Sequence, residues 1–320
     1  MPLLEFLLDN KNGNVWDISE LVTGVTWKTS RIGKAGSLDF SLLKDVDLAI
    51  NTGDIVRVRL DDQKVFYGYV FTPEIGKNEE LKVTAYDQIR YLLANDTYVF
   101  SNVTATEVLS RIAGDFSLKT GTLTDTKHRI PTMVEDNQKL LDMICKALDY
   151  TLIATGKIYV LFDDFGQLAI RDVESMVIDT VIGDDSLMYD YSYKRSIDSE
   201  TYNRIKLAQD NKESGHRDIY IAQDSANIAK WGRLQLYQTV DKAMDSTQIN
   251  ELLNQLLKLK NRESKSLKIS ALGDIRVRAG CYIPIIIEEL GINLRFLVNE
   301  CTHKGIGDPD HTMTLELKVI

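Results

Sequence analysis

Two similar sets of apolar runs decide the fold of this chain. The first set is Ser37-Leu-Asp-Phe-Ser-Leu42, Gly53-Asp-Ile-Val-Arg-Val-Arg-Leu60, Val65-Phe-Tyr-Gly-Tyr-Val-Phe71 and Leu81-Lys-Val-Thr-Ala-Tyr86. The second set, about 230 residues later, is Ser266-Leu-Lys-Ile-Ser-Ala271, Gly280-Cys-Tyr-Ile-Pro-Ile-Ile-Ile287, Leu294-Arg-Phe-Leu-Val-Asn-Glu300 and Met313-Thr-Leu-Glu-Leu-Lys-Val319. Each run has the partly alternating pattern of a strand with one buried face. Their order and spacing recur, which favours two similar β-barrels in one chain. The alternative is that any two antiparallel meanders share such a pattern.

The pattern along the chain predicts a mainly β fold with an α+β part. We expect two similar β-barrel domains, at residues 1–96 and 191–320, flanking a small α/β middle domain at residues 97–190. A long helix at about 245–262, within a helical insertion at about 225–264, is expected before the last strands of the second barrel. Its narrow apolar stripe predicts packing on the adjacent barrel rather than a coiled coil.

The middle domain should contain two helices and three short strands. Thr104 and Glu107 have the spacing of a capping box, in which each side chain satisfies a free backbone N–H of the first helical turn. A second helix is expected over residues 136–148. The strands are predicted at residues 151–154, 158–162 and 167–171.

Composition narrows the functional class. The chain has 320 residues, of which 44% are apolar and 27% charged, as in ordinary globular proteins of two or three domains. The net charge of −9 argues against sequence-specific nucleic-acid binding, which needs a basic surface. The N-terminus lacks the pattern of a signal peptide, and the apolar runs are too short to span a membrane. We therefore expect synthesis in the cytoplasm and no membrane insertion.

Few residues suggest catalysis or metal binding. Cys301, His303 and His311 are of the types that bind zinc, but a fourth ligand is not evident, so packing is the favoured interpretation. Asp164-Phe-Gly166 spells a kinase tripeptide without the other kinase motifs, which indicates a turn. The sequence therefore predicts no catalytic residues, no metal site and no cofactor.

Two further patterns support alternative functions. The run Tyr189-Asp-Tyr-Ser-Tyr193 and Trp231 could form a glycan- or receptor-binding surface, although core packing explains them equally well. Acidic pairs, which a cell-wall hydrolase would need in a cleft, are more simply solvated turn residues. These pairs are Asp61-Asp62, Asp163-Asp164, Asp184-Asp185 and Glu288-Glu289.

Several stretches together resemble a known family. They are Gly36-Ser-Leu-Asp-Phe40, Gly53-Asp-Ile-Val-Arg-Val58, Tyr202-Asn-Arg-Ile-Lys-Leu207, Lys230-Trp-Gly-Arg-Leu-Gln235, Leu272-Gly-Asp-Ile-Arg-Val-Arg-Ala-Gly-Cys-Tyr-Ile283, Phe296-Leu-Val-Asn-Glu-Cys-Thr-His303 and His311-Thr-Met-Thr-Leu-Glu-Leu317. In their order they are similar to phage tail baseplate hub proteins of the XkdQ/YqbQ-like family and, more distantly, to late-control protein D. The resemblance covers essentially the whole chain.

The resemblance implies a structural hub of a contractile phage tail or tailocin. Such a hub is a homotrimer whose six tail-tube-like barrels adapt the six-fold tail tube to the three-fold central spike. Its partners would be the tail tube protein, the spike protein and other baseplate proteins, including LysM-type tail proteins. The resemblance implies no enzymatic activity, and it places the protein in the virion tail.

The residues support such an assembly independently. Two similar barrels in one chain make a head-to-tail contact, and such contacts close into rings or continue as filaments. Small sheets also leave edges that must be paired. By position alone we predict two inter-barrel edge strands, formed by Ser37, Leu38, Asp39, Phe40, Ser41 and Leu42 and by Ser266, Leu267, Lys268, Ile269, Ser270 and Ala271.

Overall fold

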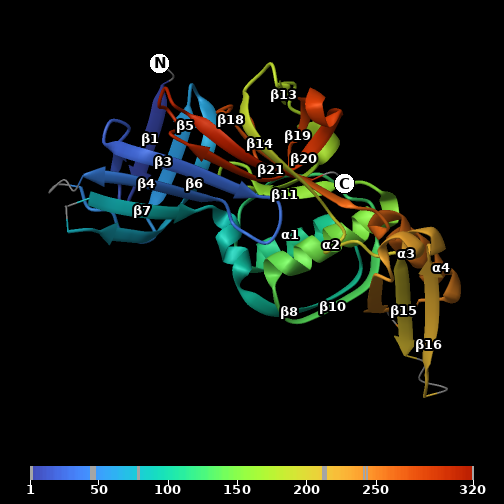
Figure 1. Cartoon of the computed structure of the whole chain (residues 1–320). Helices are drawn as coiled ribbons and strands as arrows, with labels where there is room; N and C mark the ends of the chain where they lie inside the picture. Colours follow the sequence, from blue (N-terminus) through green and yellow to red (C-terminus); the bar gives the residue numbers. More distant parts are fainter. Residues whose placement is uncertain are drawn as a thin grey trace.

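The computed structural model describes residues 3–43, 48–77, 80–210, 215–240, 242 and 244–318 of the chain. The fold is mainly β, as the sequence predicted. Its largest element is a 13-stranded sheet in the order β14-β18-β21-β20-β3-β4-β7-β6-β5-β1-β2, with β19 paired to β20 and β13 to β19. Strands from the two ends of the chain lie side by side in this sheet, as the adjacent blue and red arrows show (Figure 1).

The first half of this sheet, which we call the first unit, comes from the N-terminal part of the chain. Its strands are β1 (Leu4–Asp9), β2 (Val15–Asp17), β3 (Val22–Ser30), β4 (Ser37–Leu43), β5 (Ile55–Leu60), β6 (Gln63–Ile75) and β7 (Glu80–Tyr86). Alternate side chains of these strands are buried in one core. The rings of Phe6 on β1 and Phe40 on β4 lie 4.7 Å apart, although these strands are not neighbours in the sheet. The first unit is therefore rolled around its core.

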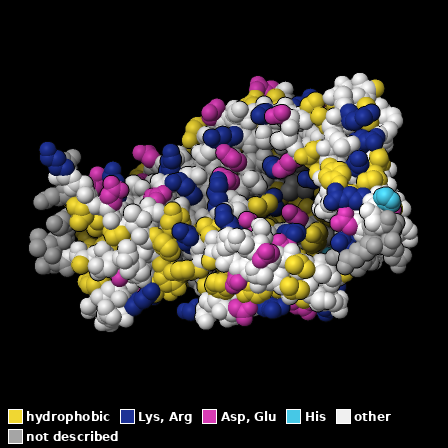
Figure 2. All heavy atoms as spheres, turned by 90° about the horizontal axis from the view of Figure 1, so that it is seen from below, with side chains coloured by type: hydrophobic (Ala, Val, Ile, Leu, Met, Phe, Trp, Pro, Cys, Tyr) yellow, Lys and Arg dark blue, Asp and Glu magenta, His cyan; other side chains and the backbone are white. Residues whose placement is uncertain are grey.

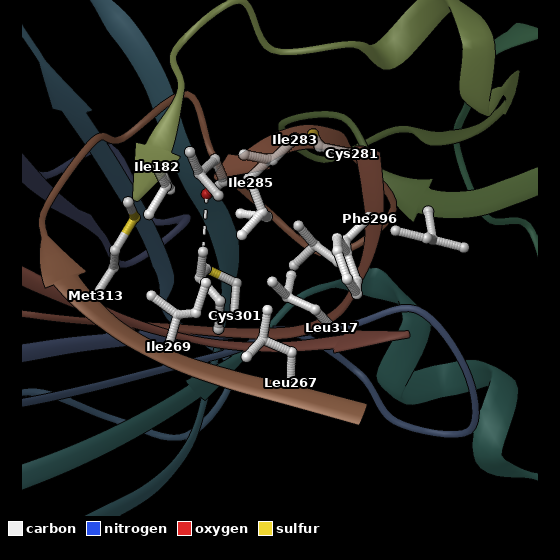
Figure 3. Close-up of a cluster of buried hydrophobic side chains, with 14 of the residues drawn as sticks. Ile182, Leu267, Ile269, Cys281, Ile283, Ile285, Phe296, Cys301, Met313 and Leu317 are labelled. Carbon is white, nitrogen blue, oxygen red and sulfur yellow. Dashed lines mark hydrogen bonds between the residues drawn. The ribbon is translucent and has the colours of Figure 1, made fainter. Parts of the chain in front are cut away.

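The second unit is built from the C-terminal strands. These are β13 (Ile182–Gly183), β14 (Met188–Ser196), β18 (Ser264–Leu272), β19 (Tyr282–Ile287), β20 (Ile292–Lys304) and β21 (Thr312–Lys318). Val319, expected at the end of the last strand, lies outside the described residues. Figure 3 shows side chains from these strands, among them Ile269, Ile285 and Leu317, pointing toward one another in a single core.

The two units share one strand order. The antiparallel series β3-β4-β7-β6-β5 in the first unit corresponds to β14-β18-β21-β20-β19 in the second. The corresponding strands β6 and β20 each have 13 residues. Each carries a bulge against its neighbour, between Val70 and Thr72 in β6 and between Val298 and Glu300 in β20. The recurrence predicted from the sequence is confirmed as a recurrence of topology.

The middle region packs under the junction of the two units (Figure 1). Its elements are η1 (Gln88–Leu93), β8 (Asn95–Val103), α1 (Ala105–Asp115), β9 (Thr120–Leu123), β10 (Ile130–Lys139), α2 (Leu140–Thr155), β11 (Tyr159–Asp163), β12 (Leu168–Asp172) and η2 (Val173–Met176). The capping box of Thr104 and Glu107 is present. The strand predicted at residues 151–154 is wrong, because this segment continues the apolar stripe of α2 and ends only at Gly156, which has positive φ.

The fourth part, which we call the satellite, is inserted between β14 and β18. It contains β15 (Arg204–Asp210), β16 (Arg217–Gln223), α3 (Ser225–Trp231), β17 (Gln235–Thr239) and α4 (Ser246–Lys260). Residues 202–208, read from the sequence as part of the second barrel, belong to this separate three-stranded sheet. α4 has the expected cap of Asp245 and Gln248. Its buried residues Ile249, Leu253 and Leu256 pack with Ile205 and Leu207 of the satellite, not on the second unit as predicted.

Candidate assembly surface

The edges of the large sheet are the first feature that could contact another chain. Among the strands that the structure describes, β14 pairs only with β18, so its other side is open. Residues Thr72–Ile75 of β6 pair only with β7, because β5 pairs with the earlier part of β6. Open strand edges present unpaired N–H and C=O groups that another strand can pair with. The open stretches lie on different units (Figure 1).

The two predicted edge segments lie elsewhere in the sheet. Ser37–Leu42 belongs to β4, which is paired on one side with β3 and on the other with β7. Ser266–Ala271 belongs to β18, which is paired with β14 and β21. Both segments are thus interior strands of this chain, since a further strand, β3 or β14, precedes each and covers its outer side. The alternation of buried residues identified them as strands but carried no information on strand order.

The junction between the units is formed by β3 and β20. These strands pair antiparallel over five residue pairs, from Glu300 opposite Ser30 to Lys304 opposite Thr26. The rings of Trp27 and His303 stack there, with centroids 5.3 Å apart and an interplanar angle of 19°. Both side chains are buried, at 4% and 0% exposure. The junction is therefore a continuous hydrogen-bonded sheet with a closed core, rather than a loose contact between two domains.

Polar groups close both ends of this junction. The N–H of Arg31 donates to the carbonyl of Asn299 at 2.9 Å, and the N–H of Gly305 donates to that of Val25 at 2.9 Å. On the exposed face, the Lys34 ammonium lies 2.7 Å from the Glu300 carboxylate. The length of β20 could have indicated this junction, because a strand of 13 residues can pair with a further strand besides β19 and β21.

The face of the sheet opposite the cores is polar. On the first unit, Asp39 accepts hydrogen bonds from Lys28 at 2.9 Å and from Thr84 at 2.8 Å. On the second unit, the same face carries Lys268 and Glu316, which lie opposite each other on β18 and β21. Basic and acidic side chains are therefore both present on this surface. Figure 2, a different face of the molecule, likewise shows basic and acidic side chains intermingled. An electrostatic attraction for a polyanion would need a basic stripe instead.

Cys301, His303 and His311, the residues considered as zinc ligands, do meet. His303 Nε2 lies 3.2 Å from Cys301 Sγ and 2.8 Å from the carbonyl of Val277, and His303 Nδ1 lies 3.0 Å from His311 Nε2. Burial lowers the pKa of His303 to about 4 and raises the pKa of the Cys301 thiol. Among the residues that the structure describes, no group of three or more His, Cys, Asp or Glu side chains is arranged to hold a metal. The cluster is a hydrogen-bonded part of the core next to Trp27.

Two buried carboxylates lie where the first unit meets the middle region. The sequence did not indicate Asp87, and it indicated Asp163 only as part of a solvated turn pair, which its 6% exposure contradicts. Asp87 follows β7 and accepts hydrogen bonds from Gly36 N at 2.9 Å and Ile89 N at 3.0 Å. Burial, and then the charge of Asp163, raise the pKa of Asp87 well above its usual range. Burial raises the pKa of Asp163 to about 6. Arg278 of the second unit donates to the carbonyl of Asp163 at 3.0 Å, so this cluster links three parts of the molecule.

The remaining acidic pairs have structural contacts. Asp61 accepts from Leu3 N at 2.7 Å, Asp164 binds Arg171 at 3.1 Å, and Asp184 accepts from Glu288 N at 2.8 Å. These contacts fix turns and strand ends, which is the simpler of the two interpretations of the sequence.

The aromatic residues considered for glycan binding are divided between two places. Tyr191 and Tyr193 pack against the core of the second unit, and Tyr189 is 61% exposed. Trp231 ends α3 and lines a pocket of about 400 Å³ whose wall also includes Lys230, Asn227 and Glu263. The tyrosines do not line this pocket. No helix among the described residues is long and apolar enough to cross a membrane.

This fold occurs in solved structures of phage tail proteins. The 43 kDa tail protein of prophage MuSo2 from Shewanella oneidensis superposes with a TM-score of 0.72 over 98% of both chains, at 14% sequence identity. A tail protein from Neisseria meningitidis MC58 superposes with a TM-score of 0.71 over 99% of this chain and 96% of that one, also at 14% identity. The rolled, duplicated sheet therefore defines a phage tail protein fold.

The chain belongs to the YQBQ-like family, whose model matches residues 25–318. It is 33% identical to YqbQ of Bacillus subtilis over 280 residues, which is 84% of this chain and 82% of that protein. It is 32% identical over 278 residues to XkdQ of the phage-like element PBSX of the same organism, with the same coverage. The resemblance stated from the sequence is confirmed.

Proposed function

We propose that this chain is the structural hub of the baseplate of a contractile phage tail or tailocin. In this proposal the first unit, within residues 1–96, and the second unit, at residues 182–196 and 264–318, are two tail-tube-like β-barrel domains; the satellite is an insertion in the second, and the middle region is the middle domain. Three chains assemble into a ring of six such barrels. The ring adapts the six-fold tail tube to the three-fold central spike.

One observation carries the proposal: the chain contains the same unit twice, and the two units are joined edge to edge through β3 and β20. The contact is head-to-tail, because one unit contributes β3 and the other contributes β20, which is equivalent to β6 and not to β3. When repeated between chains it closes into a ring if the rotation is right. A duplicated unit gives such a ring twice as many units as chains. Three chains would thus present six similar units to a six-fold tube.

The polar face of the sheet suits the inner wall of such a ring. It carries serine, threonine and charged side chains of both signs, including Lys28, Asp39, Lys268 and Glu316. A wall of this kind stays wetted and offers no basic stripe to hold a passing polyanion. The partners in this proposal are the tail tube protein, the central spike protein and other baseplate proteins, including LysM-type tail proteins.

Light scattering on the purified full chain tests the proposal, followed by electron microscopy with the tube or spike protein added. We expect the mass of three chains and ring particles with a central opening. Monomers at every concentration, together with no rings in the presence of either partner, would overturn the proposal. A zymogram should show no cell-wall clearing, and clearing would point to the hydrolase instead.

A second candidate rests on the pocket beside Trp231. An aromatic ring beside amide and charged side chains is a common arrangement for stacking a sugar. The pocket lies at the satellite, away from the junction of the two units, so a glycan-binding role is compatible with a hub. Binding of the wild-type chain but not of Trp231→Ala on a glycan array would support this role, and silence of both chains would dismiss it.

A further inference from the structure

We infer that Thr72–Ile75 of β6 in one protomer pairs antiparallel with β14 of a second copy, with Glu74 opposite Lys194. The inference rests on the proposed function, because it specifies the contact that would close the ring. The residue pairs of this contact follow from those of the β3–β20 junction within the chain. The occupant of each open edge is therefore another copy of this chain.

The register follows from the correspondence between the units. In the sheet, Ser37 and Ser266 occupy equivalent positions, which makes Lys28 on β3 equivalent to Lys194 on β14. The matching bulges make Thr72 on β6 equivalent to Glu300 on β20. Because Thr302 lies opposite Lys28 at the internal junction, Glu74 should lie opposite Lys194 at the external one.

This register places opposite charges together. Glu74 and Lys194 are both exposed, and neither forms an ion pair within the described part of the chain. At the equivalent place in the first unit, Lys28 has the acidic partner Asp39. The residue equivalent to Asp39 is Lys268 in the second unit, so Lys194, which is paired with Ser266, has a basic rather than an acidic diagonal neighbour on β18. A neighbouring chain that supplies Glu74 gives Lys194 the acid that its own sheet lacks.

The same register also places apolar groups together. Ile75 takes the position of His303, and Tyr193 takes that of Trp27, the two residues that stack at the internal junction. Ile75 is 61% exposed in the single chain, an unusual exposure for an isoleucine at the end of a strand. Tyr193 already packs partly against the core of the second unit. Pairing would cover Ile75 with Tyr193 and extend the core across the contact.

The backbone N–H and C=O groups of successive residues on β6 point in alternating directions, and this shows which residue pairs across the proposed contact a disulfide can link. Gly76 N donates to Glu80 O on the β7 side, so Glu74, two residues earlier, also directs its backbone groups toward β7. Pro73 and Ile75 then direct theirs toward the open edge. Pro73 lacks an N–H there and removes one donor from the ladder, which limits pairing with unrelated strands. Glu74 and Lys194 form a non-hydrogen-bonded pair, whose Cα atoms lie about 4.5 Å apart in antiparallel sheets.

A disulfide between these positions tests the register, since that spacing is within the range of about 4.4–6.8 Å that disulfides need. The full-length variant Glu74→Cys/Lys194→Cys should form covalent trimers as its main product on mild oxidation. Two matched controls shift the register: Glu74→Cys/Tyr193→Cys places the thiols on opposite faces, and Glu74→Cys/Ser192→Cys slips the pair by two residues. Both should stay at the level of the chain that carries only Cys145, Cys281 and Cys301.

The outcomes separate this inference from the proposed function. Three-chain particles without the expected cross-link, or with equal cross-linking in the shifted controls, would overturn the register and leave the hub proposal standing. Failure of every variant to cross-link, with only monomers in light scattering, would overturn both. A charge exchange gives a second measurement: Glu74→Lys and Lys194→Glu should each weaken trimer formation several-fold, and the double variant should restore it. Weakening that the double variant does not relieve would argue against direct pairing.

Discussion

The two units have one strand order but differ in what surrounds it. β3 connects to β4 through residues 31–36, whereas the whole satellite lies between β14 and β18. β1 pairs antiparallel with β5 over six residue pairs, whereas β13 pairs parallel with β19 over two. The shared part is the set of strands that build the polar face and the junction. The two units differ in their outer strands and in their connections. We therefore expect the strands that they share to have the same structural role in both units.

The cores of the two units are filled by side chains from different positions of equivalent strands. Gly68 of β6 lies opposite Val56, and the equivalent residue of β20, opposite Ile283, is Phe296. The aromatic ring of the first unit comes from Phe66, two residues earlier, and this ring fills the space beside Gly68. Each unit thus places one phenylalanine from the same strand in its core, at different positions. Equivalent backbones can be filled by different side chains when the total volume is similar.

The largest expected difference between equivalent residues concerns Trp27 and Tyr193. Trp27→Ala should lower the free energy of unfolding by about 3–5 kcal/mol, because it removes a buried indole and leaves His303 without its stacking partner. Tyr193→Ala should cost the single chain much less, since Tyr193 is only partly buried at an open edge. Denaturant unfolding of both variants, measured under conditions that keep the chain monomeric, checks the difference.

The control is to repeat both measurements on the assembled form. If the open edge is closed by a second copy, Tyr193→Ala should then reduce assembly, while its effect on the monomer stays small. Equal destabilisation of the monomer by both substitutions would show that the edge at β14 is already covered within the chain. That result would remove the distinction between an internal and an external junction.

Sequence patterns predicted strands better than strand order. Alternation identified β4 and β18 correctly, and the capping residues at Thr104 and Asp245 located two helix starts. Neither pattern indicates which strand lies beside another, so both predicted edges turned out to be interior. Residues 202–208 read as one more strand of a barrel because burial on one face looks the same in a satellite sheet. Asp87 was missed, and Asp163 was wrongly interpreted as a solvated turn residue, because their burial depends on segments distant in the sequence.

Gly68→Ala probes the different filling of the two cores. A Cβ at this position would lie 2.3 Å from the carbonyl oxygen of Tyr86 and 2.5 Å from the ring of Phe66. Because the first of these atoms is backbone, the strands must move apart, and we expect a loss of about 1–3 kcal/mol in the free energy of unfolding. Thermal unfolding compares this variant with Gly114→Ala, where a Cβ meets nothing within 4 Å. Similar stability of both variants would mean that the core of the first unit adapts easily.

Asp163→Asn tests the pair of buried acids, Asp87 and Asp163, at the contact between the first unit and the middle region. Burial raises the pKa of Asp163 from 3.8 to about 6, so the folded chain binds more protons than the unfolded chain between these values. The contribution of Asp163 to stability is therefore complete below about pH 4 and is lost as the pH rises through about 6.

The asparagine variant should lack this pH-dependent loss and should be more stable than the wild-type chain at pH 8, by on the order of 1–2 kcal/mol. Asparagine can still accept the hydrogen bond from Gly166 N, so the turn is retained. The matched control is Asp164→Asn, which alters the exposed neighbour that binds Arg171. Unfolding midpoints from pH 4 to 8 that fall equally in the wild-type chain and Asp163→Asn would show that the buried charge is stabilised by its surroundings.

The smallest expected effects come from Lys28 and Lys194, which are equivalent in position but not in partner. Lys28→Ala should lower the free energy of unfolding of the monomer by about 0.2–1 kcal/mol, since it removes an exposed ion pair with Asp39. Lys194→Ala should leave the monomer unchanged or slightly more stable, because Lys194 is paired with Ser266 on β18 and its diagonal neighbour there is Lys268. The order should reverse for trimer formation, measured by sedimentation at low salt, where Lys194→Ala loses the proposed contact with Glu74. If both lysines affect only the monomer, the charge at β14 serves the sheet of its own chain, and the ring must be held by other contacts.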